Sequence, residues 1–147
     1  MKKVLIAYFS RTGTTKKMAE YLAEGVRIAG FEAKLEEITN LKDKKNLLGY
    51  DGYIFGCPTY HKDITQNMKT FLFLADSAQL SEKVGGAFGS HTHSGEAAPL
   101  IFETMEHVLK MDMTTLGPLN LIESKVKEDE GLRACQQYAI ALCEKIK

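Results

Sequence analysis

The sequence predicts an α/β fold, a doubly wound five-stranded parallel sheet with helices on both faces. Apolar runs of strand length alternate along the chain with amphipathic segments of helical length. The first and third of these runs, residues 4–9 and 53–57, contain no charged residue, as expected of parallel strands that are buried on both faces. No linker, repeat or low-complexity segment divides residues 1–147, so we expect a single domain.

In the first half of the chain, each expected element has its own signal. Apolar residues at helical spacing follow the first strand and predict a helix over residues 15–29, with Gly30 as its stop signal. Residues 31–36 alternate between apolar and polar, which is typical of an edge strand with one solvated side. Residues 42–46 form a polar connection or a short helix, and the turn Asp51-Gly52 leads into the third strand.

The second half of the chain continues the alternation. Its expected elements are a helix over 68–75, a strand over 84–88, a helix over 96–111, a strand within 114–122 and a helix over 128–145. Small residues in the fourth strand indicate close backbone approach. Pro99 suits the first turn of the helix expected over 96–111. Gly117-Pro118 interrupts the fifth strand, and the last helix begins with acidic residues that complement its dipole.

The charge balance and the cysteines limit the classes of partner and compartment. Lysine and arginine together number 19, as do aspartate and glutamate, which argues against nucleic acid or an anionic membrane as an electrostatic partner. The three cysteines, Cys57, Cys135 and Cys143, include no CxxC pair, and their odd number favours a reducing cytoplasm. The apolar run at 4–9 is too short for a signal peptide or a membrane span, so we expect a cytoplasmic protein without membrane insertion.

A hydroxyl-rich turn joins the first strand to the first helix. It consists of Ser10, Arg11, Thr12, Gly13, Thr14 and Thr15. Unpaired backbone N–H groups at a helix start lie at the positive end of the helix dipole, and with hydroxyls they form a socket for a phosphate. An ordinary Ser/Thr N-cap is the alternative interpretation. No Gly-Lys-Ser/Thr follows and only one glycine is present, so the turn is neither a nucleotide P-loop nor a dinucleotide fingerprint.

Two further loops leave the carboxyl ends of neighbouring strands, where ligands bind in open α/β sheets. The second loop contributes Pro58, Thr59, Tyr60 and His61, and the third contributes Ser90, His91, Thr92, His93, Ser94, Gly95 and Glu96. Three of the four histidines of the chain lie in these loops. Because aromatic and imidazole planes can stack on a flat ligand, the two loops are suited to an aromatic ring.

Two other kinds of site are weaker interpretations of the same loops. His91 and His93 could bind a metal together with His61 or Glu96, but no third ligand or supporting pattern is fixed. Cys57 ends the third strand, but no arginine follows at phosphatase spacing, so a buried structural thiol is favoured over a nucleophile. We therefore assign no metal ligand and no catalytic residue.

Three motifs in the right order resemble the flavodoxin family across the whole chain. Ser-x-Thr-Gly-x-Thr at 10–15 resembles the loop that holds the FMN phosphate, and Gly-x-Pro-Thr-Tyr at 56–60 is similar to the loop that contacts the isoalloxazine ring. Residues 88–97 resemble the matching segment in the flavodoxin domains of flavodiiron proteins, where an aromatic pair commonly occupies the positions of His91 and His93. The resemblance implies a short-chain flavodoxin-like fold with strand order 2-1-3-4-5, and FMN as the cofactor.

The resemblance also implies roles for the side chains. The hydroxyls at 10–15 would bind the phosphate, with Arg11 adding charge or pointing to solvent. Thr59, Tyr60 and His61 would line one side of the ring, and His91 and His93 the other. His61 stands where a glycine commonly allows a peptide to turn toward the ring, and a non-glycine residue resists positive φ. Together with the neutral net charge, this predicts that the two one-electron steps lie closer together than in an acidic flavodoxin.

The expected function is transfer of electrons between redox enzymes, a reductase and an acceptor, by an FMN protein that is a monomer or a weak dimer. The alternative is an FMN-dependent NAD(P)H:quinone or nitro-compound reductase, and a third interpretation is a binding domain that has lost its flavin. The sequence contains no recognisable nicotinamide site, which favours the carrier. The neutral charge favours the enzyme, because carriers usually dock through an acidic face.

Overall fold

The computed structural model describes residues 1–147 and contains a parallel sheet at its centre. Its strands are β1 (Lys3–Tyr8), β2 (Glu32–Glu37), β3 (Gly52–Gly56), β4 (Val84–His91), β5 (Asp112–Met113) and β6 (Leu119–Ile122). The order is β2-β1-β3-β4-β5, and β6 also pairs with β4. The predicted strand order is therefore confirmed, and the point at which the strand order reverses lies between β1 and β3.

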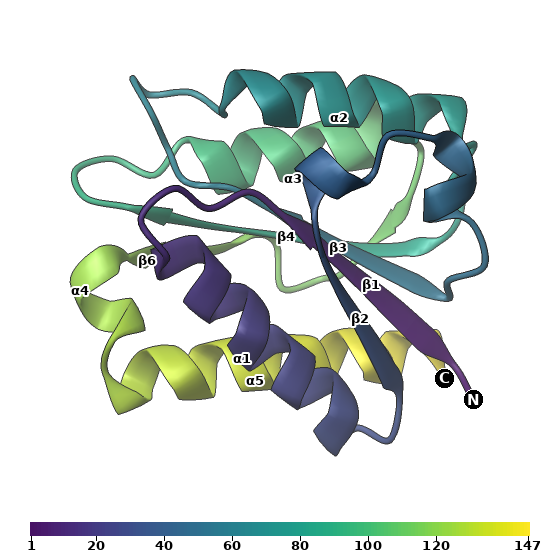
Figure 1. Ribbon diagram of the computed structural model, residues 1–147. Helices are drawn as coiled ribbons and strands as arrows, with labels where there is room; N and C mark the ends of the chain where they lie inside the picture. Colours follow the sequence, from purple (N-terminus) through teal and green to yellow (C-terminus); the bar gives the residue numbers. More distant parts are fainter.

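Helices cover both faces of the sheet, as predicted. They are α1 (Thr14–Ile28), α2 (Gln66–Ser77), α3 (Ala97–His107), α4 (Glu123–Val126) and α5 (Asp129–Ile146), with 3₁₀ turns at Ile38–Asn40 and Lys44–Leu47. Figure 1 shows α2 and α3 on one side of the sheet and α1 and α5 on the other. None of these helices is both long enough and apolar enough to cross a lipid bilayer.

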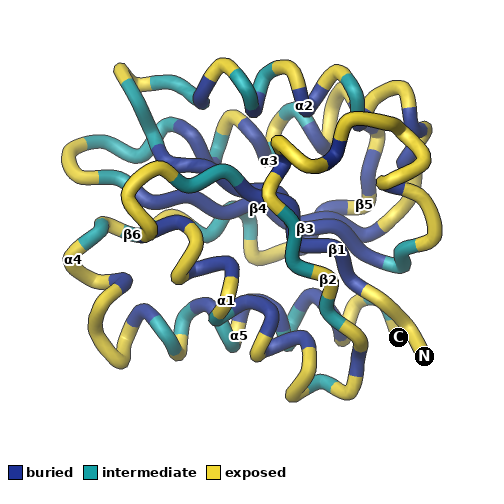
Figure 2. Tube along the Cα trace, viewed as in Figure 1, coloured by how far each residue is buried: buried dark blue, intermediate teal, exposed yellow.

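Each face of the sheet packs against its own core. In β1, Leu5 and Ala7 belong to the cluster under α2 and α3, whereas Val4 and Ile6 belong to the cluster under α1 and α5. Burial of an aliphatic side chain of this size stabilises the fold by about 1.5–3 kcal/mol. The central strands are buried along their length in Figure 2, whereas β2 alternates between exposed and half-buried positions, as an edge strand should.

The fourth strand is longer than its sequence predicts. It continues to His91, because residues 88–91 pair with residues 119–122 of β6. Ser90 and His91 therefore lie on a strand, and the expected loop from 89 is limited to the residues between His91 and α3. The helix that follows ends at His107 and not at the predicted residue 111. After it, Lys110 adopts a φ of 58° and the chain turns into β5.

The fifth strand consists of two pieces that lie on either side of a turn. It begins before the predicted range, at Asp112, and the segment after Met113 leaves the sheet before β6 returns to it. The hydroxyl of Tyr138 on α5 spans this gap: it accepts a hydrogen bond from the Ala87 N–H at 3.1 Å and donates to the Gly117 carbonyl at 2.7 Å. A helix side chain thus supplies the hydrogen bond that a continuous fifth strand would have made.

The two ends of the chain lie side by side at the amino end of β1 (Figure 1). The Lys2 ammonium donates a hydrogen bond to the carbonyl of Ile146 at 3.4 Å. Both ends are therefore at the edge of the sheet opposite to the carboxyl ends of β1 and β3, from which the predicted site loops leave.

Candidate functional site

The hydroxyl-rich turn forms the start of α1 without an ordinary side-chain N-cap. Gly13 occupies the N-cap position with a left-handed φ of 100°. Because glycine has no side chain, it adopts this conformation readily and turns the chain sharply into the helix. The Ser10 hydroxyl accepts hydrogen bonds from the N–H groups of Gly13 at 3.2 Å and Lys16 at 3.1 Å. Backbone donors at a helix start thus converge on one oxygen, which is the chemistry of an anion socket.

Thr15 and Ser90 anchor this turn from behind. Their hydroxyl oxygens lie 2.8 Å apart, and both residues are almost fully buried. Neither residue lines either of the two hollows described below, although both are among the predicted site residues. Their hydrogen bond fixes the first turn of α1 against the end of β4.

Arg11 extends over the second loop. Its guanidinium carbon lies 5.8 Å from the centre of the Tyr60 ring, within the range of a cation–π contact. Arg11 is exposed, in agreement with the expected side chain in solvent, and its charge lies over the ring of Tyr60. Arg11 thereby connects the hydroxyl-rich turn to the loop that carries Tyr60.

The second loop contains a tight two-residue turn. Tyr60 and Asp63 exchange both backbone hydrogen bonds at 3.0 Å, and His61 and Lys62 between them have φ values of 51° and 62°. Positive φ at both central positions defines a type I′ turn. His61 nevertheless adopts positive φ, because the paired hydrogen bonds of its neighbours hold it in that conformation. The expected spacing of the two one-electron steps stays a prediction.

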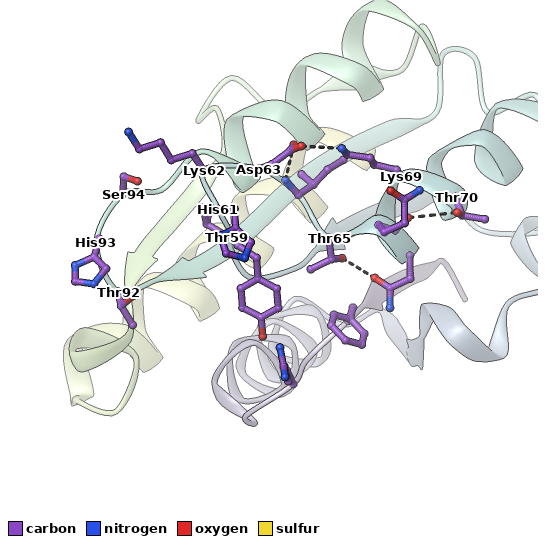
Figure 3. A pocket seen from close by; sticks show the side chains of 16 residues that line it. Thr59, His61, Lys62, Asp63, Thr65, Lys69, Thr70, Thr92, His93 and Ser94 are labelled. Carbon is purple, nitrogen blue, oxygen red and sulfur yellow. Dashed lines mark hydrogen bonds and ion pairs between the residues drawn. The ribbon is translucent and has the colours of Figure 1, made fainter.

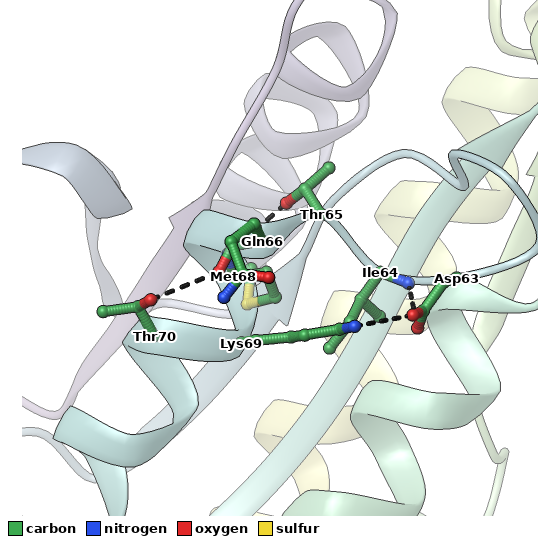
Figure 4. A network of polar contacts seen from close by, with 7 residues as sticks. All are labelled: Asp63, Ile64, Thr65, Gln66, Met68, Lys69 and Thr70. Atoms are coloured by element: carbon green, nitrogen blue, oxygen red, sulfur yellow. Dashed lines mark hydrogen bonds and ion pairs between the residues drawn. The ribbon is translucent and has the colours of Figure 1, made fainter.

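The far end of this turn is fixed to α2, as Figure 4 shows. The Asp63 carboxylate pairs with the Lys69 ammonium at 2.7 Å and accepts from the Ile64 N–H at 2.7 Å. The hydrogen bond from Lys69 is the main reason that the pKa of Asp63 lies below its ordinary value. Thr65 caps α2 by accepting from the Met68 N–H at 3.4 Å.

The second and third loops are joined to each other through Thr59. Its N–H donates to the carbonyl of Ser90 at 3.0 Å, and its hydroxyl accepts from the N–H of Ala97 at 3.0 Å. Farther along the third loop, the His91 ring nitrogen Nδ1 lies 3.1 Å from Asn120 Oδ1, so His91 is directed to β6. His93, in contrast, lines the pocket with its neighbours Thr92 and Ser94.

An open pocket of about 1310 Å³ runs between these loops and the start of α2 (Figure 3). Predicted site residues that line it are Arg11, Thr59, Tyr60, His61, Thr92, His93 and Ser94. It also includes residues that are not among the predicted binding residues, namely Phe9, Lys62, Asp63, Ile64, Thr65, Gln66, Asn67, Lys69 and Thr70. The start of α2 could have been suspected from its position after the second loop, since Thr65 has the residue type of an N-cap.

A second hollow of about 520 Å³ lies beside the hydroxyl-rich turn. Thr12, Gly13 and Thr14 line it, together with the exposed lysines Lys16 and Lys17. The remaining predicted residues, Ser10, Thr15, Pro58, Ser90, His91, Gly95 and Glu96, line neither space. Lys127 also lines this hollow, and the three lysines outnumber its two glutamates, Glu20 and Glu123. Anions are attracted by this excess of positive charge and by the start of α1, so this end of the site is suited to a phosphate.

The weaker interpretations find no support in the geometry. No three side chains of the His, Cys, Asp and Glu types lie together as a metal-binding group. Cys57 is fully buried, and burial raises the pKa of its thiol to about 11. A thiol with that pKa is protonated at neutral pH, so it is not an activated nucleophile.

Two observations fit this site to a phosphorylated flat ligand such as FMN. The start of α1 presents backbone donors around a left-handed glycine, and the neighbouring pocket is bordered by the ring of Tyr60. In addition, the carboxylate oxygen Oε1 of Glu96 is buried without a hydrogen-bond partner in the chain. A buried acceptor of this kind is costly unless a donor reaches it, but Glu96 lines neither hollow, so this oxygen is not counted toward the fit.

Comparison with known proteins agrees with the fold and the motifs. The family model described as Flavodoxin matches residues 6–137. A flavodoxin of Clostridium saccharobutylicum is 30% identical, with 89% of this chain and 91% of that protein covered. An NAD(P)H dehydrogenase (quinone) of Cupriavidus metallidurans is 33% identical, with 80% of this chain and 71% of that protein covered. Among solved structures, a flavodoxin from the domain Archaea superimposes with a TM-score of 0.89 at 26% identity, covering 98% of both chains.

Proposed function

Since this chain belongs to the flavodoxin family, whose cofactor is FMN, we propose that it carries electrons between a reductase and an acceptor enzyme. The protein is an FMN-binding electron-transfer flavoprotein. The observation that carries the proposal is the left-handed Gly13 at the start of α1 beside an open pocket bordered by Tyr60. An exposed pocket gives a protein partner access to the cofactor.

We propose that one end of the site binds the phosphate of FMN and the other end binds its ring. Backbone donors at the start of α1 and the hydroxyls of Ser10, Thr12 and Thr14 would hold the phosphate. Tyr60 and the segment 92–94 would face the ring. Thr15 would act from behind, through the hydrogen bond to Ser90 that fixes the first turn of α1.

Bound FMN supplies the redox chemistry, accepting and releasing electrons one or two at a time. Around it, the side chains of this chain set the electrostatic environment. Arg11 and Lys62 are exposed cations at the pocket, whereas Lys69 is paired with Asp63. Nearby positive charge favours the gain of negative charge on reduction, so we expect a higher midpoint potential than an acidic surface would allow.

A second candidate function is direct reduction by NAD(P)H followed by transfer to a quinone. The similarity to the dehydrogenase of Cupriavidus metallidurans favours it, because that relative covers most of this chain. The carrier is preferred because the sequence contains no recognisable nicotinamide site.

An anaerobic titration distinguishes the two functions. Apoprotein is loaded with FMN and mixed with NADH or NADPH, first alone and then with an NADPH-dependent flavoprotein reductase. For a carrier, the yellow colour bleaches only after the reductase is added, and the reduced protein then passes electrons to a second acceptor. Bleaching by NADH or NADPH alone would establish the dehydrogenase instead.

A further inference from the structure

We propose that Asn120 is a positioning residue for the flavin ring, because its side chain holds both ends of the segment that would face the ring. This segment comprises residues 92–94, which line the same pocket as Tyr60 and are labelled at its border in Figure 3. The proposal rests on the placement of FMN in that pocket. Asn120 itself is outside the pocket, so it would act through the loop and not by contact.

The amide of Asn120 makes one hydrogen bond to each flank of the segment. Nδ2 donates to the carbonyl of Gly95 at 2.7 Å, and Oδ1 lies 3.1 Å from Nδ1 of His91. Because the amide nitrogen serves Gly95, the oxygen must accept from His91, and Nδ1 of His91 therefore carries the hydrogen. One side chain thus spans the loop from its first flanking residue to its last.

The absence of a side chain at residue 95 brings the loop against this amide. A Cβ atom on Gly95 would lie 2.6 Å from Asn120 Oδ1, much closer than real contacts allow. Gly95 does not have a positive φ, so its role here is space and not backbone conformation. The backbone of the third loop therefore lies flush against the Asn120 amide.

The support beneath this contact is a rigid pair of strands. Asn120 is in register with Gly89, within a ladder that joins residues 88–91 of β4 to residues 119–122 of β6. Asn120 thereby fixes the loop relative to β4. The same strand contains Ser90, which hydrogen-bonds to Thr15 at the phosphate end. A loop that is ordered in advance binds its ligand more tightly, because less conformational entropy is lost on binding.

The test uses Asn120→Ala, with Asn46→Ala as the matched control. Asn46 also uses its side-chain oxygen as an acceptor, from the Asp43 N–H, in a turn that belongs to another part of the chain. Binding of FMN and of riboflavin, which lacks the phosphate, is measured for both variants together with visible circular dichroism of the bound ring. Asn120→Ala should weaken both ligands equally, by about fivefold, and change the dichroism spectrum, because one or two exposed hydrogen bonds are lost.

A double-mutant cycle separates positioning from general stability. His91→Ala combined with Asn120→Ala should bind FMN no more weakly than Asn120→Ala alone, because both substitutions break the same connection. Wild-type affinity and an unchanged dichroism spectrum in Asn120→Ala would overturn the inference, as would a loss of affinity that Asn46→Ala shares. If the wild-type protein bound neither FMN nor riboflavin, the proposed function would fail first.

Discussion

The hydroxyl oxygens of Thr15 and Ser90 lie 2.8 Å apart in the interior, with the two residues only 2% and 1% exposed. This hydrogen bond joins the first turn of α1 to β4 across 75 positions of sequence. The turn that would hold a phosphate is therefore fixed by a contact that the ligand itself does not make.

Removing one partner of this buried pair should destabilise the fold. Ser90→Ala leaves the Thr15 hydroxyl buried without a partner, which costs about 1–3 kcal/mol. Thr15→Ser keeps the hydrogen bond and serves as the control, with a smaller loss from its missing methyl group. Urea unfolding of the apoproteins measures both, and an equal stability of Ser90→Ala and wild type would contradict the structural role.

Gly13→Ala should reduce the affinity for FMN but not for riboflavin. A Cβ at Gly13 would meet no atom within 4 Å, so the cost is the strain of a φ of 100° at an alanine, about 1–2 kcal/mol. The backbone of the Gly13→Ala variant would relieve this strain by moving away from a φ of 100°. That movement would displace the backbone N–H groups at the start of α1, where the phosphate would bind.

Gly30→Ala is the matched control for this substitution. Gly30 also has an open left-handed conformation, with φ of 87°, at the opposite end of α1. Both variants should lose similar stability in thermal unfolding. If Gly30→Ala weakened FMN as much as Gly13→Ala, the phosphate would not be held at the start of α1.

Replacing His61-Lys62 by Asn-Gly should stabilise the apoprotein. Asn-Gly is the preferred pair of a type I′ turn, whereas both native residues have positive φ and carry a β-carbon. We expect a gain of roughly 1 kcal/mol in the free energy of unfolding. The Ala-Ala variant removes the same side chains without relieving the strain, so a similar gain in that variant would refute the explanation.

Stability should fall at alkaline pH through the buried thiols. Burial raises the pKa of Cys135 to about 12 and that of Cys143 to about 11, from an ordinary value of 9.0. Below pH 9 the thiols are protonated in both states, so their contribution is fully present. Above it the unfolded chain releases protons that the folded chain retains, and the free energy of unfolding decreases up to about pH 11.

Denaturant unfolding measures this effect between about pH 8 and pH 10.5. This range begins roughly one unit below the ordinary thiol pKa. Cys135→Ala removes one of the titrating groups, so its stability should fall less steeply than that of the wild type over the same range. Parallel pH profiles of the two proteins would show that this thiol does not contribute.

The central strands and the three loops could be predicted because their signals are local, whereas the strand order was predicted from the family resemblance. Residues 4–9 are apolar throughout, and the hydroxyl-rich turn follows them directly. The extension of β4 to His91 could not be predicted in this way, since it depends on pairing with β6, about 30 residues later in the chain. The contacts of Asn120 with His91 and Gly95 are long-range for the same reason, and nothing in the surrounding sequence marks them.

The positive φ of His61 could not be predicted from the sequence, for a different reason. Intrinsic preference disfavours positive φ outside glycine, but the hydrogen bonds between Tyr60 and Asp63 and the ion pair with Lys69 outweigh it. The preference of a single residue is about 1 kcal/mol, which is less than several tertiary contacts together supply.

The neighbouring chain ends, joined by the hydrogen bond from Lys2 to the Ile146 carbonyl, make the molecule convenient to tether. A linker, a fused enzyme or an electrode surface can be attached at either end while the pocket at the opposite edge of the sheet keeps facing outward. A short peptide could also close the chain into a circle, with new ends opened at an exposed turn. The cofactor would then be presented in the same orientation from every molecule of an immobilised layer.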